Sequence, residues 1–382
     1  MIKIYYWAPF LSKIATVASV TRSIESIKRY YKKDIDIELI DSVGEWESIK
    51  EKIPNIKIIK LYKTDLYNKL PKKGFIQSRF TQIFIYIFSF FKLLKLLRNN
   101  RPDYIMVHLV ASLPLILMSF LNNKTKMILR ISGLPRLNFI RKNYWKFFSK
   151  NVYKVTCPTI ATYERLRLLN IFEENQLELL YDPIISTRDI IQKKKVDIEN
   201  KFKNKKFIIG IGRLTKQKNF KCLINAFKKI HNNEKDLNLL ILGEGEKSSS
   251  LRNLSHKLKL SEFIHFLGYK ENIYSYLKKA DCFILSSLWE DPGFVLIESA
   301  FLNIPIISSD CHNGPKEIIN NNERGYLFEN DNINSLVKTY SEFRNSEKNL
   351  VRKKIQRAKV YSKNYTIFAH YLKLSKILNL KN

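Results

Sequence analysis

The chain has 382 residues, of which 45% are apolar and 13% aromatic. This content excludes an intrinsically disordered protein, and the length predicts about two domains. Lys and Arg number 67 against 35 Asp and Glu, a formal net charge of +32 that favours anionic partners. The four cysteines form no C-x-x-C pair, which argues against a zinc ribbon or a disulfide-stapled secreted domain and favours a reducing cytosol.

Short apolar runs alternate with amphipathic stretches along the chain. The strands expected in the first half are Ile2–Trp7, Ile35–Ile40, Ile56–Leu61, Tyr104–His108, Met127–Ile131, Val152–Cys157 and Leu177–Tyr181. Those expected in the second half are Phe207–Ile211, Leu237–Leu242, Phe263–Phe266, Cys282–Ser286 and Ile304–Ser308. Helical periodicity fills most gaps, as in Ile83–Arg98 and Asn219–Ile230. This alternation predicts α/β domains with parallel sheets, and the first residues predict a strand rather than a signal peptide.

A polar, lysine-rich break separates two halves of different glycine content. The break spans Ser186–Lys206, and only three of the eleven glycines precede it. Glycine permits tight turns and close backbone approach at the carboxyl ends of strands. The second half therefore predicts a nucleotide-binding Rossmann-like domain, and the break predicts a linker.

The positive charge is concentrated in one window. Between Leu66 and Tyr163 the only acidic residue is Asp103, whereas the same window holds 17 Lys and Arg and many aromatic residues. Basic residues mixed with aromatic ones suit lipid headgroups, lipid-linked phosphates or nucleic acid. A compositional bias towards Lys, Ile and Asn is the alternative explanation.

Two apolar stretches in this window have some character of membrane spans. Ile83–Leu97 is short for a span of about 20 residues and is interrupted by Lys92 and Lys95. Tyr104–Leu121 contains Pro114 and is better explained as a buried strand followed by a buried helix. We therefore expect no transmembrane helix but reversible, charge-driven binding to an anionic membrane surface.

A first candidate site follows the strand Phe207–Ile211. The run contains Gly210 and Gly212 and then two cations, Arg213 and Lys218, before a helix. Glycines let the backbone approach a phosphate, a helix N-terminus favours an anion, and the cations neutralise its charge. Alone this pattern is common, so it indicates a phosphate site only weakly.

A second candidate site is more specific. The strand Cys282–Ser286 is followed by Glu290 in a loop, by Gly293 and by a helix that begins near Phe294. Glu298 comes eight residues after Glu290, about one turn into that helix. Carboxylates accept hydrogen bonds from sugar or ribose hydroxyls, while backbone N–H groups at the helix start bind phosphate.

A third motif completes a recognisable order. The strand that begins at Ile304 ends in Ser308-Ser309-Asp310, and Gly314-Pro315-Lys316-Glu317 begins another helix. The G-R-L-x-x-x-K run, the E-x7-E element, P-I-I-S-S-D and G-P-K-E-I-I in this order resemble the family-4 retaining glycosyltransferases of GT-B fold. The resemblance is strong over about residues 205–330 and weak before residue 180.

The resemblance implies roles for individual residues. It places Arg213 and Lys218 on the donor diphosphate and Glu298 on the ribose hydroxyls. It places Glu290 near the donor sugar as a catalytic residue, with the backbone N–H groups of Gly293 and Phe294 on the donor sugar or phosphate. Many members have E-G-F-G where this chain has Glu290-Asp291-Pro292-Gly293, and the loop Ala8–Lys13 lacks their glycines.

Three residues of the first half are further candidates. His108 ends the strand Tyr104–His108, and in related enzymes a histidine near this place contacts the donor sugar; an equally weighted alternative is that it is merely structural. Lys13 and Arg130 are weaker candidates for the acceptor side of the cleft. His312 beside Cys311 has no second ligand pair, so it predicts a polar loop rather than a metal site.

A metal-dependent GT-A enzyme is the rival architecture. It requires an Asp-x-Asp metal motif, and the string Asp34-Ile35-Asp36 lies near the N-terminus on a strand edge. We interpret these carboxylates as solvated. The expected mechanism is therefore metal-independent and needs no cofactor, since cations and a helix N-terminus stabilise the leaving diphosphate.

These observations predict two Rossmann-like domains of GT-B type that face each other across a cleft. Residues 1–185 are expected to bind the acceptor, 186–345 the nucleotide-sugar donor, and helices in 346–382 to pack back on the N-terminal domain. The expected enzyme transfers a sugar with retention, a UDP-sugar being favoured, to a lipid-linked saccharide in bacterial O-antigen or capsule biosynthesis. It is expected in the cytoplasm at the inner face of the plasma membrane. The alternatives are a nucleotide-sugar epimerase or phosphorylase of the same fold and a basic nucleic-acid-binding protein, although no nucleic-acid motif is visible.

Overall fold

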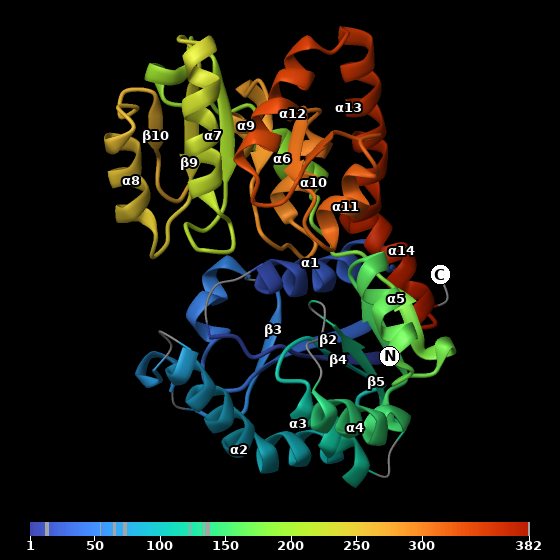
Figure 1. The fold of residues 1–382 in the computed structure, drawn as a ribbon. Helices are drawn as coiled ribbons and strands as arrows, with labels where there is room; N and C mark the ends of the chain where they lie inside the picture. Colours follow the sequence, from blue (N-terminus) through green and yellow to red (C-terminus); the bar gives the residue numbers. More distant parts are fainter. Residues whose placement is uncertain are drawn as a thin grey trace. The chain divides into compact units, whose positions relative to one another are not determined.

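The structure is a computed structural model that describes residues 1–11, 15–53, 55–63, 66–71, 75–121, 124–131, 133 and 138–380. The chain divides into two compact units. Unit 1 comprises Met1–Pro183 and Ile367–Asn382, and unit 2 comprises Ile184–Thr366. Each unit has its own parallel sheet with helices packed against it (Figure 1).

The sheet of unit 1 has seven parallel strands in the order β3-β2-β1-β4-β5-β6-β7. Their bounds are β1 Ile2–Trp7, β2 Ile35–Asp41, β3 Lys57–Lys60, β4 Tyr104–Val107, β5 Lys126–Arg130, β6 Lys154–Cys157 and β7 Leu177–Leu179. The direction in which strands are added reverses between β1 and β4. In doubly wound sheets ligands bind outside the carboxyl ends of the strands at this switch point.

Helices of unit 1 connect these strands. They are α1 Ala15–Tyr30, α2 Phe75–Asn100, α3 Ser112–Leu117, α4 Phe139–Phe148, α5 Ile160–Leu169 and α14 Ile367–Ile377. Short 3-10 turns are η1 Glu47–Lys52, η2 Tyr67–Lys69, η3 Met118–Phe120, η4 Ser149–Asn151 and η5 Glu174–Gln176. All four residues of β4 are buried, as expected for a parallel sheet covered on both faces.

Unit 2 repeats the topology with six strands in the order β10-β9-β8-β11-β12-β13. The strands are β8 Phe207–Ile211, β9 Asn238–Leu242, β10 Ile264–Phe266, β11 Phe283–Leu285, β12 Ile306–Ser309 and β13 Tyr326–Phe328. The helices are α6 Thr187–Lys193, α7 Phe220–Asn233, α8 Ser248–Lys257, α9 Tyr274–Lys279, α10 Phe294–Phe301, α11 Gly314–Ile319, α12 Ile333–Asn345 and α13 Lys348–Ser362, with turns η6 Asn200–Phe202 and η7 Lys363–Tyr365. The switch point of this sheet lies between β8 and β11.

Two Rossmann-like α/β domains with C-terminal helices were predicted, and the structure confirms them. Three details differ from the prediction. The break Ser186–Lys206 is not a plain linker, because it contains α6 and η6. The strand β13 was not predicted, because its three residues are too few to show a period.

The predicted tail 346–382 also divides differently. Helix α13 packs on α10 and belongs to unit 2, whereas the prediction grouped it with the helices that pack on the N-terminal domain. Only α14 packs in unit 1, against α1. The reason is visible in the side chains, since Lys359 of α13 bonds the carbonyl of Phe301 at the end of α10.

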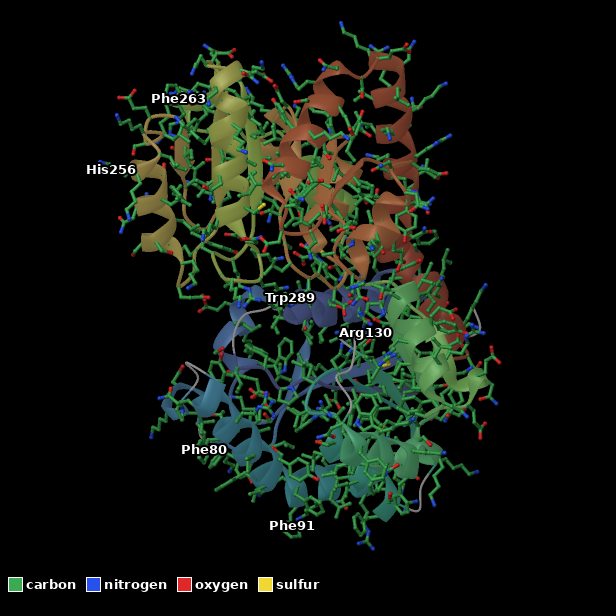
Figure 2. The ribbon with its side chains drawn as sticks, in the orientation of Figure 1. Phe80, Phe91, Arg130, His256, Phe263 and Trp289 are labelled. Carbon is green, nitrogen blue, oxygen red and sulfur yellow. The ribbon has the colours of Figure 1, made fainter. Side chains whose placement is uncertain are left out.

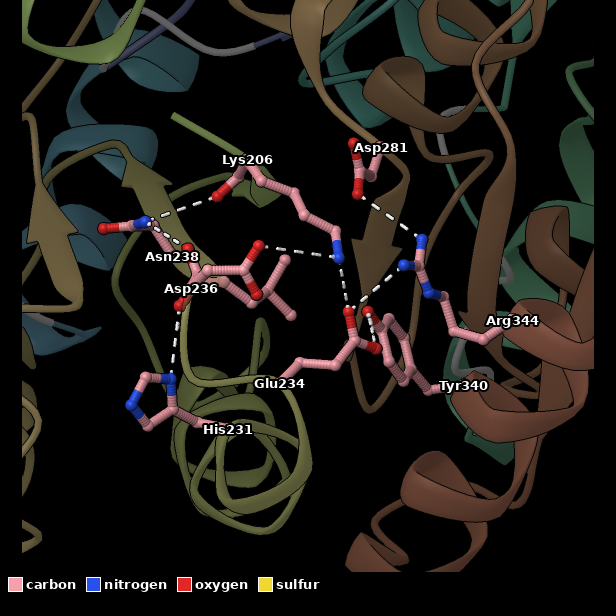
Figure 3. A network of polar contacts seen from close by, with 9 residues as sticks. Lys206, His231, Glu234, Asp236, Asn238, Asp281, Tyr340 and Arg344 are labelled. Carbon is pink, nitrogen blue, oxygen red and sulfur yellow. Dashed lines mark hydrogen bonds and ion pairs between the residues drawn. The ribbon is translucent and has the colours of Figure 1, made fainter. Parts of the chain in front are cut away.

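A polar network joins the amino ends of the strands in unit 2 (Figure 3). The Glu234 carboxylate, which follows α7, accepts hydrogen bonds from Lys206 Nζ at 2.8 Å and from Tyr340 Oη at 3.0 Å. Arg344 Nη2 lies 3.2 Å from the same carboxylate, and its other terminal nitrogen lies 3.5 Å from Asp281. Glu234 thus connects α7, α12 and the residue before β8 at the amino ends of the strands, opposite the switch point.

Replacing Glu234 with alanine should destabilise unit 2. The change leaves two cations and a tyrosine without their shared acceptor, a loss of roughly 1–3 kcal/mol. For a unit of 183 residues this lowers the thermal unfolding midpoint by roughly 2–10 °C, which calorimetry can measure. Glu246→Ala is the control, because Glu246 is exposed on the same unit. Equal midpoints for the two variants would contradict a stabilising role of the network.

Candidate active site

The switch point of unit 2 brings the first two sequence motifs together. Lys218 follows β8, and Glu290 follows β11, which pairs with β8 in the sheet. The Lys218 ammonium forms an ion pair with Glu290 Oε1, and Ser287 Oγ donates to the same oxygen at 2.5 Å. Glu290 is only 5% exposed, so this carboxylate is held by one cation and one hydroxyl inside the fold.

The two loops that carry this ion pair are bonded to each other. The Leu288 amide donates to the Gln217 carbonyl at 2.8 Å, and Gln217 Nε2 donates to the Trp289 carbonyl at 2.8 Å. Ser286 Oγ donates to the Lys218 carbonyl at 3.0 Å. These bonds fix the loop backbone, so that Lys218 and Glu290 are preorganised before any ligand binds.

Glycines shape the start of the helix that follows. Gly293 has φ +98°, a conformation that other residues adopt at a cost, and Phe294 begins α10 directly after it. At Gly314, which begins α11, a Cβ atom would lie 1.6 Å from the Pro292 carbonyl oxygen. Only glycine therefore lets α11 approach this loop. At the start of α10, the Phe294 amide is one of the free N–H groups to which an anion can bind.

The second carboxylate lies on α10 itself. Glu298 is 8% exposed, and its Oε1 accepts a hydrogen bond from Tyr274 Oη at 2.9 Å. Tyr274 begins α9, and its side chain is buried. The tyrosine orients the carboxylate, which as an anionic acceptor suits a pair of ribose hydroxyls.

Arg213 differs from Lys218 in its surroundings. Its side chain is exposed, and within the described ranges its one polar contact is with Gln217 Oε1, at 3.5 Å. Gly212 precedes it, with its amide bonded to the Leu242 carbonyl at 2.9 Å. The structure thus places Arg213 on the same loop as Lys218, with a guanidinium that is open to an incoming phosphate.

His108 lies in unit 1, at the switch point of the other sheet. It directly follows β4, and its amide donates to the Trp7 carbonyl of β1 at 2.9 Å. The side chain is buried beside the ring of Tyr6, and neither ring nitrogen has a hydrogen-bond partner among the residues that the structure describes. Burial, with the nearby Arg130 charge, lowers the pKa of His108 to about 3, so the imidazole is neutral near pH 7.

Arg130 is committed to a buried ion pair. Its Nη2 lies 2.5 Å from Asp182 Oδ1, to which Ser19 Oγ also donates, and its Nη1 donates to the Ile131 carbonyl. Burial alone would raise the pKa of Asp182, but the Arg130 charge and these hydrogen bonds lower it below its usual value. The structure therefore gives Arg130 a structural partner rather than the open position expected of an acceptor-binding residue.

A second buried histidine, His370 of α14, lies in a hydrogen-bonded chain. Its Nδ1 donates to the Tyr181 carbonyl at 2.7 Å, and its Nε2 accepts from Ser23 Oγ at 3.0 Å. Burial lowers the pKa of His370 to about 4. Protonation of Nε2 would remove the acceptor that Ser23 uses.

These histidines predict loss of stability in acid. A histidine whose folded pKa is lowered contributes its full stability above its unfolded pKa of about 6.5, and loses it as the pH falls towards the folded pKa. Between pH 7 and 5, His108 should cost up to about 2 kcal/mol. His108→Phe, which keeps a ring against Tyr6, should therefore show a smaller fall of the unfolding midpoint over this range.

His256→Phe is the matched control, since His256 is exposed on α8. This variant should follow the wild-type pH profile. If His108→Phe also follows that profile, charging of the buried imidazole does not limit acid stability.

The remaining candidates from the sequence give no further site. Lys13, within the loop Ala8–Lys13, lies outside the described residues. Asp36 of β2 pairs with Lys57 at 2.7 Å and Lys3 at 3.9 Å, and its side chain is only 11% exposed, so it is a partly buried ion-pair partner rather than the solvated carboxylate that was expected. Among the residues that the structure describes, no group of three or more His, Cys, Asp or Glu is arranged to hold a metal ion.

Comparisons with known proteins identify the family. Residues 191–361 match the model of glycosyl transferases group 1. The chain is 30% identical over 275 residues to N-acetylgalactosamine-N,N'-diacetylbacillosaminyl-diphospho-undecaprenol 4-alpha-N-acetylgalactosaminyltransferase of Campylobacter jejuni. The alignment covers 69% of this chain and 71% of that relative. The chain belongs to the group 1 glycosyltransferases. An uncharacterized glycosyltransferase of Methanocaldococcus jannaschii is 32% identical over 60% of this chain, and the match spans about three fifths of that relative's length (61%).

Solved glycosyltransferases share the fold. A glycosyltransferase of Rickettsia africae aligns with 100% of this group 1 chain at a TM-score of 0.74 and 17% identity. HepE of Anabaena, crystallised with UDP and glucose, aligns with 100% of the chain at a TM-score of 0.71 and 12% identity. The GT-B-type pair of Rossmann-like domains is therefore the architecture of this glycosyltransferase.

Sequence reasoning missed several supporting residues of this group 1 site. Ser287, Tyr274 and Gln217 position Glu290, Glu298 and the two loops. Ser287 carried a signal, since it directly follows the strand that leads to Glu290. Tyr274 carried none, because it is 24 residues away from its partner Glu298 and its hydroxyl meets the carboxylate only in the folded unit.

Proposed function

We propose that this protein transfers a sugar, with retention at the anomeric carbon, from a nucleoside diphosphate sugar to a lipid-linked saccharide. The observation that carries the proposal is the pairing of Lys218 with Glu290 at the switch point, beside the start of α10 and the carboxylate of Glu298. A donor with a diphosphate, a ribose and a sugar needs cationic, carboxylate and N–H groups in this combination.

Donor cleavage leaves negative charge on the diphosphate. Arg213, Lys218 and the N-terminus of α10, all in unit 2, would stabilise that charge, which supports a metal-independent mechanism without a cofactor. Lys218 would exchange its bond to Glu290 for the phosphate when the donor binds. Glu290 then becomes available to a sugar hydroxyl, and Phe294 supplies a backbone N–H.

His108 is proposed to contact the donor sugar from unit 1. Its two ring nitrogens are buried and have no partner in the described part of the chain, and a neutral imidazole can both accept and donate a hydrogen bond. A sugar hydroxyl offers the complementary donor and acceptor. This role needs no charged histidine, which agrees with its low pKa.

The acceptor is proposed by likeness to relatives. The Campylobacter relative is named for a diphospho-undecaprenol-linked substrate. A UDP-Gal:alpha-D-GlcNAc-diphosphoundecaprenol alpha-1,3-galactosyltransferase of Escherichia coli is 32% identical over 33% of this chain. These names support a UDP-sugar donor and a lipid-linked acceptor. From them we infer a role in bacterial cell-surface polysaccharide such as O-antigen or capsule. Such an enzyme would act in the cytoplasm, peripherally at the inner face of the plasma membrane.

A donor screen tests the proposal. The protein is incubated with individual nucleoside diphosphate sugars and a lipid-extract acceptor, and nucleoside diphosphate release and glycolipid formation are measured. We expect a UDP-sugar to give UDP release, and this release should require the acceptor. Conversion of the donor into an isomer without transfer would instead indicate an epimerase. Saturable nucleic-acid binding at moderate salt without transfer would indicate a basic nucleic-acid-binding protein.

A further inference from the structure

Helix α2 has an apolar stripe on its outer side. Phe80, Ile83, Ile87 and Phe91 recur at spacings of three and four residues, and their side chains are 65%, 56%, 62% and 77% exposed. We call these four residues the outer stripe. Phe80 and Phe91 are labelled in Figure 2 and point away from the sheet of unit 1. Spacings of three and four place all four side chains on one face of the helix.

The opposite side of α2 is part of the core of unit 1. Ile85, Leu93 and Leu97 are fully buried, and Ser89 lies between them on the same face. The helix is therefore apolar on two sides, one packed and one open. Arg79–Asn100 is long and apolar enough to cross a membrane. Only 28% of its most apolar window is buried in the protein, so most of this window lies outside the core of unit 1.

Exposed apolar residues continue beyond α2. Phe120 of η3 lies beside Phe90 of α2, with ring centroids 6.4 Å apart, and is 65% exposed. Three further exposed apolar residues lie on α4, whose Tyr144 bonds the Ser112 carbonyl of α3: Phe139, Ile140 and Phe147. Isolated exposed apolar residues are normal, but a contiguous set of large ones indicates a binding surface.

The charges around the stripe identify its partner. Lys92, Lys95 and Arg98 are exposed in the last turns of α2, next to Phe91. Lys146 of α4 and Lys150 of η4 are exposed on either side of Phe147. The only acidic residue between Leu66 and Tyr163 is Asp103. Apolar side chains bordered by cations match the acyl and anionic headgroup layers of a bilayer.

We propose that α2 lies in the plane of an anionic membrane and inserts its outer stripe between the lipid headgroups. The inference deepens the proposed function, on which it rests for the lipid-linked acceptor. It also adds to the sequence prediction, which was of reversible, charge-driven binding. The inserted side chains retain the protein when salt screens the charges.

Two other arrangements fit less well. A helix that crosses the bilayer would have to withdraw Ile85, Leu93 and Leu97 from the core of unit 1. A second copy of the chain on the stripe would bring two basic, almost acid-free surfaces together, which is unfavourable. An anionic lipid surface satisfies both the apolar and the charged groups.

Vesicle binding of the full chain tests the proposal. Sedimentation with vesicles of phosphatidylethanolamine and about 30% phosphatidylglycerol is measured in about 0.1 M and 0.5 M NaCl. The double variant Ile87→Ser/Phe91→Ser should partition at least about tenfold more weakly than the wild type, at both salt concentrations. The matched control Leu350→Ser/Val360→Ser, on the exposed side of α13 in unit 2, should bind as the wild type does.

The charges are tested separately. Lys92→Glu/Lys95→Glu/Arg98→Glu should weaken binding mainly at low salt, whereas Arg352→Glu/Lys353→Glu/Arg357→Glu on α13 should not. Complete release of the wild type by 0.5 M NaCl, with equal binding of the serine variant, would overturn insertion. An unchanged unfolding midpoint of each variant shows that it folds.

Insertion itself is measured by quenching. Brominated acyl chains should quench the fluorescence of Phe91→Trp but not that of Val360→Trp, each relative to the wild type. Quenching of neither would overturn the proposal, as would a stripe-dependent dimer in sedimentation velocity. Vesicle binding without sugar transfer would refute the proposed function alone, and transfer without vesicle binding would refute this inference alone.

Discussion

Lys218→Ala should lower kcat/KM about 10²-fold or more. Lys218 is the cation nearest Glu290, and its ammonium stabilises the negative charge that develops on the departing diphosphate. Because the loops are held to each other by the Leu288 amide and the Gln217 side chain, neither of which involves the Lys218 side chain, the fold should survive the change. The measurement is steady-state kinetics with the donor identified by the screen, together with the unfolding midpoint.

Arg213→Ala should cause a comparable loss, since its guanidinium is exposed and its bond to Gln217 is long, which leaves it available to the diphosphate. Lys216→Ala is the matched control, because Lys216 is an exposed cation of the same loop. Near-normal turnover in both Lys218→Ala and Arg213→Ala would refute the assignment of the phosphate site. A loss of the same size in Lys216→Ala would show that general loop charge, rather than these two positions, matters.

The two glutamates should separate binding from transfer. Glu298→Gln should weaken binding of the free nucleoside diphosphate about tenfold or more, since ribose hydroxyls lose a charged acceptor. Glu290→Gln should reduce transfer while nucleotide affinity stays nearly intact, because its carboxylate is reserved for the sugar. Calorimetry with the nucleotide and kinetics with the complete donor measure the two effects.

Two further variants make this test sharper. Tyr274→Phe removes the hydroxyl that orients Glu298 and should weaken nucleotide binding less than Glu298→Gln does. Glu271→Gln, at an exposed position of unit 2, should change neither quantity. Identical losses of nucleotide affinity in Glu290→Gln and Glu298→Gln would contradict the division of roles.

The fold was largely predictable because parallel strands are buried on both faces. The predicted Phe207–Ile211 is β8, and the apolar run that begins at Tyr104 is β4 followed by buried α3. Such runs are apolar over four or five residues and end in glycine or polar turns. The three-residue strand β13 has too few residues for any period, and the division of the C-terminal helices depends on contacts with α10 and α1 that no local pattern records.

The candidate site was predictable where its residues are close in sequence to a strand end. Lys218 and Glu290 each follow a strand, and adjacent strands at the switch point explain their contact. Arg130 was a weaker candidate for the acceptor side of the cleft, and its pairing with Asp182 was not foreseen, because the two residues are 52 positions apart in the sequence. Long-range pairing of this kind has no signature in composition or spacing.

The route of the chain through the two units has a consequence for biosynthesis. Unit 1 is interrupted after Pro183 and is resumed only at Ile367, so α14 emerges from the ribosome after all of unit 2. Until then α1 lacks its cover of Tyr371 and Leu374, and Ser23 lacks its bond to His370. During synthesis of this enzyme, unit 1 therefore remains without its last helix while all of unit 2 is translated. Premature termination near residue 366 would leave the α14-facing surface of α1 exposed. The truncated protein would then be recognised by chaperones and proteases.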